Sequence, residues 1–128
     1  MEERHPAFLA LEALKLKTGM GGVRLCVFEG DESQMEVFRT SNGIDVITLS
    51  SFSLKNFSVA AFEGALGHEF GHIIIARGNK KYKMIDEQRV ADSIAISLVG
   101  EKAVLEAYLA HTGNLALAKR RVAQAKKK

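Results

Sequence analysis

The sequence predicts an α+β domain in which a small antiparallel sheet precedes a helix with an HExxH motif and further C-terminal helices. Short apolar and alternating runs, separated by the turn signals Gly30-Asp31 and Asn42-Gly43, fill the first half of the chain and are typical of strands. A long run over 59–77 contains apolar residues at helical spacing and ends at Gly78. Helical spacing then continues toward the C-terminus, so the strands come first and the helices follow.

Each element of the first half has a local signal. A helix is predicted over Ala7–Lys17, because Pro6 is tolerated in a first turn and Gly19 suits the C-terminal stop. Asn42-Gly43 tolerates positive φ at both residues and therefore predicts a hairpin between the last two strands. The three predicted strands are Val23–Phe28, Met35–Arg39 and Ile44–Ser50.

The second half of the chain is predicted to form four helices. Serine and aspartate side chains can cap helix N-termini, and glycine suits a left-handed stop at the C-terminus. The predicted helices are Val59–Arg77 after a Ser58 cap, a helix capped by Asp86 that ends before Gly100, Glu101–Ala110, and a final amphipathic helix after Asn114.

Composition is consistent with one folded domain. The chain has 128 residues, of which 47% are hydrophobic and 26% charged, values that are typical of globular rather than disordered chains. The net charge of +3 comes from the C-terminal end, where 119–128 holds six Lys or Arg residues and leaves 1–118 net acidic. We assign 1–118 to a single domain and 119–128 to a basic helix end or tail.

Cysteine content and hydropathy favour a cytoplasmic protein without a membrane span. Cys26 is the only cysteine, so no intrachain disulfide can form and any metal site must be built from His, Asp and Glu. The N-terminal segment 1–10 is charged, unlike a secretory signal, and the apolar runs are far shorter than the roughly 18 residues that cross a bilayer. Cys26 itself is expected to be a buried strand residue.

The segment His68-Glu69-Phe70-Gly71-His72 carries the HExxH pattern. At helical spacing the two histidines lie on one face and can bind one metal ion, while Glu69 can act as general base on a metal-activated water. The surrounding small residues would let another backbone or a substrate approach closely; they are Gly64, Ala65, Gly67 and Gly71.

The segment that follows this helix resembles a known signature. Residues 86–95, which include Ala91-Asp92-Ser93-Ile94-Ala95, resemble the ExxAD-x-x-A signature of gluzincin metallopeptidases, notably the ImmA/IrrE-type enzymes. Together with HExxH, the resemblance covers about half of the chain. It implies a zincin-like fold, one zinc ion per chain, peptide-bond hydrolysis, and an Asp92 that hydrogen-bonds a metal-binding histidine.

The third metal ligand is left open by the sequence. In the families that the chain resembles, the ligand glutamate stands four residues before this aspartate, and here Gln88 occupies that position. Glu87, one residue away, falls on the inward stripe of the predicted helix with Val90 and Ile94. Glu87 is therefore one candidate ligand, Asp92 is the second, and an impaired or two-histidine site is the remaining alternative.

Other residues receive weaker expectations. The resemblance implies that a peptide substrate lies along an edge strand, and Ile44–Ser50 is our candidate. Tyr82 is either a hydrogen-bond donor to a developing oxyanion or a surface tyrosine. His5 and His111 have no partner at ligand spacing and are expected at the surface.

We therefore expect a zinc-dependent metallopeptidase that acts on peptide or protein substrates, with His68 and His72 as metal ligands and Glu69 as general base. The alternative is a catalytically impaired zincin-like module that contacts protein or nucleic acid. Gln88 and the basic segment 119–128 favour this alternative, although that segment also fits a solvated helix end.

Overall fold

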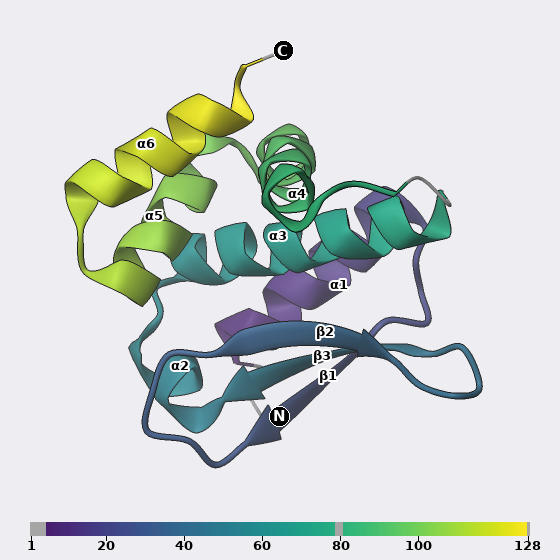
Figure 1. Ribbon diagram of the computed structural model, residues 1–128. Helices are drawn as coiled ribbons and strands as arrows, with labels where there is room; N and C mark the ends of the chain where they lie inside the picture. The colour runs from purple at the N-terminus through teal and green to yellow at the C-terminus, as the bar shows by residue number, and fades with distance from the viewer. Residues whose placement is uncertain (1–4, 79–80, 128) are drawn as a thin grey trace.

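The computed structural model describes residues 5–78 and 81–127 and contains three strands and six helices over these residues (Figure 1). The sheet packs on α1 and α3, while α4, α5 and α6 lie on the other side of α3. The predicted α+β class is confirmed. The elements are α1 (Pro6–Thr18), β1 (Arg24–Phe28), β2 (Met35–Arg39), β3 (Asp45–Ser50), α2 (Ser51–Asn56), α3 (Val59–Arg77), α4 (Met84–Val99), α5 (Glu101–Thr112) and α6 (Leu115–Ala125).

The sheet is mixed, with the strand order β1-β3-β2. β2 and β3 pair antiparallel through the predicted hairpin, in which Gly43 has a φ of 82° and donates its N–H to the Thr40 carbonyl at 2.9 Å. β1 and β3 pair in parallel, so the expectation of a wholly antiparallel sheet is wrong. The hairpin signal describes only strands that are neighbours in sequence, whereas the place of β1 depends on contacts between distant residues.

β3 is the central strand, and it carries the most buried side chains of the sheet. Val46, Ile47 and Leu49 are buried, as is typical of a strand that is covered on both sides. The expectation that Ile44–Ser50 is a free edge for substrate is therefore wrong. β1 and β2 are the edge strands.

Serine side chains cap two helices in the middle of the chain. Ser58 Oγ accepts the Ala61 N–H at 3.1 Å, which confirms the predicted cap of α3. Ser50 ends β3 and also caps α2, because its Oγ accepts the Ser53 N–H at 3.2 Å. The sequence analysis did not predict α2, whose six residues are too few to show a helical period.

The start of α4 differs from the prediction. The helix begins at Met84, and Lys83 occupies the N-cap position without a side-chain hydrogen bond. Asp86 lies within the first turn, so the expectation that it caps this helix is wrong. An acid in a first turn is still stabilised by the helix dipole.

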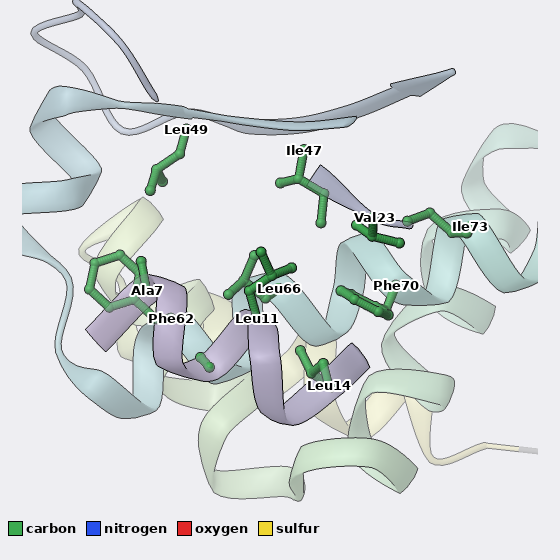
Figure 2. Packing of buried hydrophobic residues seen from close by; sticks show 11 residues of the cluster. Ala7, Leu11, Leu14, Val23, Ile47, Leu49, Phe62, Leu66, Phe70 and Ile73 are labelled. Atoms are coloured by element: carbon green, nitrogen blue, oxygen red, sulfur yellow. The ribbon is translucent and has the colours of Figure 1, made fainter. Parts of the chain in front are cut away.

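Apolar side chains from three elements meet between the sheet and the helices (Figure 2). Ile47 of β3 faces Leu11 of α1 and Leu66 of α3. Burying each such side chain contributes about 1.5–3 kcal/mol, so this cluster fixes α3 against the sheet. Leu25 packs against the same core, and successive strand residues point to opposite faces. Cys26 is therefore exposed, and the expectation that it is buried is wrong.

Two glycines on α3 let the following helices approach its backbone closely, as the sequence predicts. A Cβ at Gly64 would overlap the carbonyl oxygen of Ala103 on α5. A Cβ at Gly71 would lie 2.6 Å from the carbonyl oxygen of Ala91 on α4. These close approaches place side chains of α4 and α5 beside the HExxH face of α3.

Candidate metal centre

The histidines of the motif converge on one face of α3. Their Nε2 atoms lie 3.0 Å apart, and the rings meet edge to face with centroids 4.6 Å apart. Ligand atoms of His68, Glu69 and His72 all lie within 4.8 Å of one another. The structure therefore brings these three predicted residues together.

A carboxylate of α4 holds the outer nitrogen of each ring. Asp92 Oδ1 lies 2.6 Å from His68 Nδ1, and Glu87 Oε2 lies 2.8 Å from His72 Nδ1. An ionised carboxylate only accepts hydrogen bonds, so each Nδ1 carries a proton and donates it. In the neutral rings, both Nε2 atoms then present lone pairs to each other across 3.0 Å.

This arrangement fits a divalent cation. Two lone pairs at 3.0 Å repel each other unless a cation or a proton lies between them. Two imidazole nitrogens that share one tetrahedral zinc ion, each at about 2.0–2.1 Å, are about 3.3 Å apart, close to the separation of the Nε2 atoms of His68 and His72. Burial alone would lower the pKa of His68, but the hydrogen bond and charge of Asp92 outweigh it and raise this pKa, which makes the ring a stronger donor to a cation.

The two candidate third ligands contact the outer nitrogens of the rings, whereas Gln88 contacts an inner one. Glu87 and Asp92 contact Nδ1 atoms, and for Asp92 this contact is the one that the resemblance implies. Gln88 Oε1 lies 3.3 Å from His72 Nε2, on the inner side of the pair. The amide can present its oxygen to a cation. A ligand role for Glu87 or Asp92 stays a prediction.

Glu69 is buried beside the two rings. Its Oε2 atom has no hydrogen-bond partner within the described part of the chain. Burial is the largest cause that raises the pKa of Glu69 to about 7, with the charges of Glu36 and Asp92 adding to it and that of His68 opposing it. A carboxyl group with a pKa near neutrality can both accept and return a proton at physiological pH.

The site opens into a cleft of about 880 Å³. All five residues of β2 (Met35–Arg39) line it, together with residues of α3, α4 and α5. The edge strand of the sheet therefore forms one wall beside Glu69 and the histidines. The residues that line the cleft from α5 are Val104, Ala107, Tyr108 and His111.

Tyr108 is a site residue that the sequence analysis missed. Its hydroxyl group donates to Asp92 Oδ2 at 2.5 Å. Burial and then the charge of Asp92 raise the pKa of Tyr108 far above its usual value, so the phenol keeps its proton. Tyr82, the alternative donor to an oxyanion, is not among the residues that line the cleft.

The two remaining histidines differ from each other. His5 is half-buried, caps α1 by accepting the Ala7 N–H at 3.1 Å, and packs against Phe62, so the expectation of a surface residue is wrong for it. His111 is exposed, as expected, and its Nδ1 atom lies 2.8 Å from Ser33 Oγ at the border of the cleft.

An ion-pair cluster around the buried Asp45 borders the same cleft. Asp45 is 5% exposed and receives hydrogen bonds from Arg39 Nε at 3.2 Å and from Arg77 Nη2 at 2.9 Å. Burial alone would raise the pKa of Asp45, but the two guanidinium groups outweigh it and hold this pKa below its usual value. The cluster ties the start of β3 to the end of α3.

Within the described residues, none of the helices has the length and apolar character needed to cross a bilayer. Comparisons with protein-family models, with curated proteins and with solved structures find no match for this chain.

Proposed function

We propose that this protein is a zinc-dependent metallopeptidase with one metal ion per chain. The observation that carries the proposal is the 3.0 Å approach of His68 Nε2 and His72 Nε2 while both Nδ1 atoms are held by carboxylates. Two oriented imidazoles, a buried carboxyl group beside them and an open cleft form the usual set for metal-assisted hydrolysis.

The roles of the residues follow from their contacts. His68 and His72 would hold the ion through Nε2, and the Gln88 amide oxygen, 3.3 Å from His72 Nε2, would be a neutral donor beside them. A bound divalent ion supplies a Lewis acid, which lowers the pKa of water and polarises a carbonyl group. Glu69 would accept a proton from the attacking water and return it to the leaving amine, a role that suits a buried carboxyl group whose pKa is raised to about 7.

The substrate in this proposal is an extended peptide on β2. β2 is an edge strand and lines the cleft along its whole length. The outer edge of such a strand offers unpaired backbone N–H and C=O groups to a second strand. β2 therefore takes the substrate-binding role that was expected for Ile44–Ser50, which contains the central strand of the sheet.

A second candidate function is a zincin-like binding module without strong catalysis. Gln88 favours it, because a neutral amide is a weaker zinc ligand than the glutamate that the resembling families have at this position. In this case the partner is a protein or a nucleic acid, the latter through exposed basic residues of α6. With Cys26 as the only cysteine, a cytoplasmic location belongs to either proposal.

Cleavage of an unstructured protein by the zinc-loaded chain separates the two functions. We expect wild type to cleave, and Glu69→Gln to bind zinc equally but to cleave about 10²–10⁴-fold more slowly, because it lacks the general base. Equal cleavage by both proteins, or none by zinc-loaded wild type, contradicts the peptidase proposal.

A further inference from the structure

A chain of hydrogen bonds runs from α5 through α4 to the HExxH helix. Tyr108 donates its hydroxyl proton to Asp92 Oδ2 at 2.5 Å, and Asp92 Oδ1 accepts from His68 Nδ1 at 2.6 Å. We propose that Tyr108 is a positioning residue, which acts through Asp92 to fix the orientation of His68 and the nitrogen that carries its proton. The inference rests on the proposed function in one respect, which is that the proposed function makes His68 a metal ligand.

Asp92 depends on Tyr108 because almost no solvent reaches its side chain, which is 3% exposed. Each of its two oxygens has one donor, the phenol on Oδ2 and the imidazole on Oδ1. A buried carboxylate oxygen without a donor is costly. With Tyr108 occupying Oδ2, the remaining oxygen accepts from His68 Nδ1, and the His68 Nε2 lone pair is directed at His72.

His72 has weaker support and provides an internal comparison. Its Nδ1 partner, Glu87, has a side chain that is 39% exposed, so water can satisfy the second oxygen of this carboxylate. The two histidines are therefore held differently, although they are four residues apart on one helix. Loss of the Tyr108 hydroxyl group should disturb His68 and leave His72 nearly unchanged.

The position of Tyr108 is itself built by packing. Gly64 lets α5 approach α3 so closely that a Cβ there would overlap the Ala103 carbonyl oxygen. The Tyr108 and His68 rings meet edge to face with centroids 6.5 Å apart. Tyr108→Phe keeps this ring contact and removes only the donor, so it separates positioning from packing.

The test uses metal-free protein labelled with ¹⁵N in its histidines, and reads the tautomer of each ring from its nitrogen chemical shifts. Wild type, Tyr108→Phe and the matched control Tyr82→Phe are compared. At a pH where both rings are neutral, we expect His68 of wild type and of the control to carry its proton on Nδ1. In Tyr108→Phe we expect a mixture of tautomers at His68 and little change at His72. Asp92→Asn, whose amide can donate to Nδ1, should change His68 more strongly and serves if Tyr108→Phe does not fold.

A zinc competition titration on the same proteins adds a second readout. Loss of the hydrogen-bond partner of a ligand histidine typically weakens metal binding about 10–100-fold. We expect a loss of this size for Asp92→Asn, a smaller loss for Tyr108→Phe and none for Tyr82→Phe. Unchanged His68 shifts in folded Tyr108→Phe overturn the positioning role, whatever the zinc affinity. If wild type binds no zinc but His68 still changes in Tyr108→Phe, the proposed function fails and the positioning role stands.

Discussion

His68 Nε2 and His72 Nε2 face each other at 3.0 Å. Each ring is oriented by a carboxylate that α4 supplies to its far nitrogen. Because the rings are held in this orientation, less side-chain entropy is lost when a metal ion binds. The arrangement depends on Gly71, which lets α4 pack against the backbone of α3.

Replacing Gln88 by glutamate should strengthen the site. The substitution puts an anionic oxygen where an amide oxygen now lies 3.3 Å from His72 Nε2, and carboxylates are better zinc ligands than amides. We expect at least about tenfold tighter zinc binding, which is about 1.4 kcal/mol, in competition with a chromophoric chelator. Gln124→Glu adds the same charge at an exposed position of α6 and should have little effect. Equal zinc affinities in the two variants would contradict a ligand position at residue 88.

Alanine at the α3 glycines should destabilise the protein in a graded way. Gly71→Ala places a Cβ 2.6 Å from the Ala91 carbonyl oxygen, whereas at Gly67 the nearest atom is the Val99 Cγ2 at 3.1 Å. Overpacking against backbone costs about 1–3 kcal/mol, while alanine gains about 1 kcal/mol of helix propensity. We expect Gly71→Ala to lower the free energy of unfolding in urea and Gly67→Ala to change it little. Gly21→Ala, with open space around its Cβ, is the control, and equal stability of Gly71→Ala and this control would show that α4 does not pack as described.

Asp45→Asn should lower stability in a pH-dependent manner. Because the pKa of Asp45 is lowered in the folded protein, its contribution is present above the unfolded-state pKa of about 3.9 and is lost as the pH falls through the folded-state value. We expect the variant to be about 1–3 kcal/mol less stable at pH 7, with the difference shrinking below about pH 4. Urea unfolding at several pH values measures this. A difference that stays constant down to pH 2 would contradict the ion-pair cluster.

The sequence predicted local features well, because these depend on neighbouring residues. Ser58, Asn42-Gly43 and the HExxH spacing each act within one turn or one hairpin, and the structure has the expected cap, hairpin and histidine pair. Asp92 was also placed beside a histidine, from the resemblance rather than from spacing.

Features that depend on contacts between distant residues could not be predicted in this way. The parallel pairing of β1 with β3 and the exposure of Cys26 follow from which strand takes the centre of the sheet. Tyr108 reaches Asp92 from the next helix, and only its place on the inner face of α5 could have pointed to it. Glu87 was expected to face inward. Whether it then meets Nε2 or Nδ1 of His72 depends on how α4 is rotated against α3, and in the structure it meets Nδ1.

The most direct test of the metal centre is the zinc content of the purified, zinc-reconstituted protein after dialysis, measured by mass spectrometry of the metal. Wild type should retain one zinc ion per chain, and His68→Ala and His72→Ala should each lose it, because each removes one of two converging nitrogens. His111→Ala, which removes an exposed histidine that contacts Ser33, should retain the zinc. A wild-type chain that retains no zinc, or His68→Ala and His72→Ala variants that both retain it fully, would contradict the metal centre.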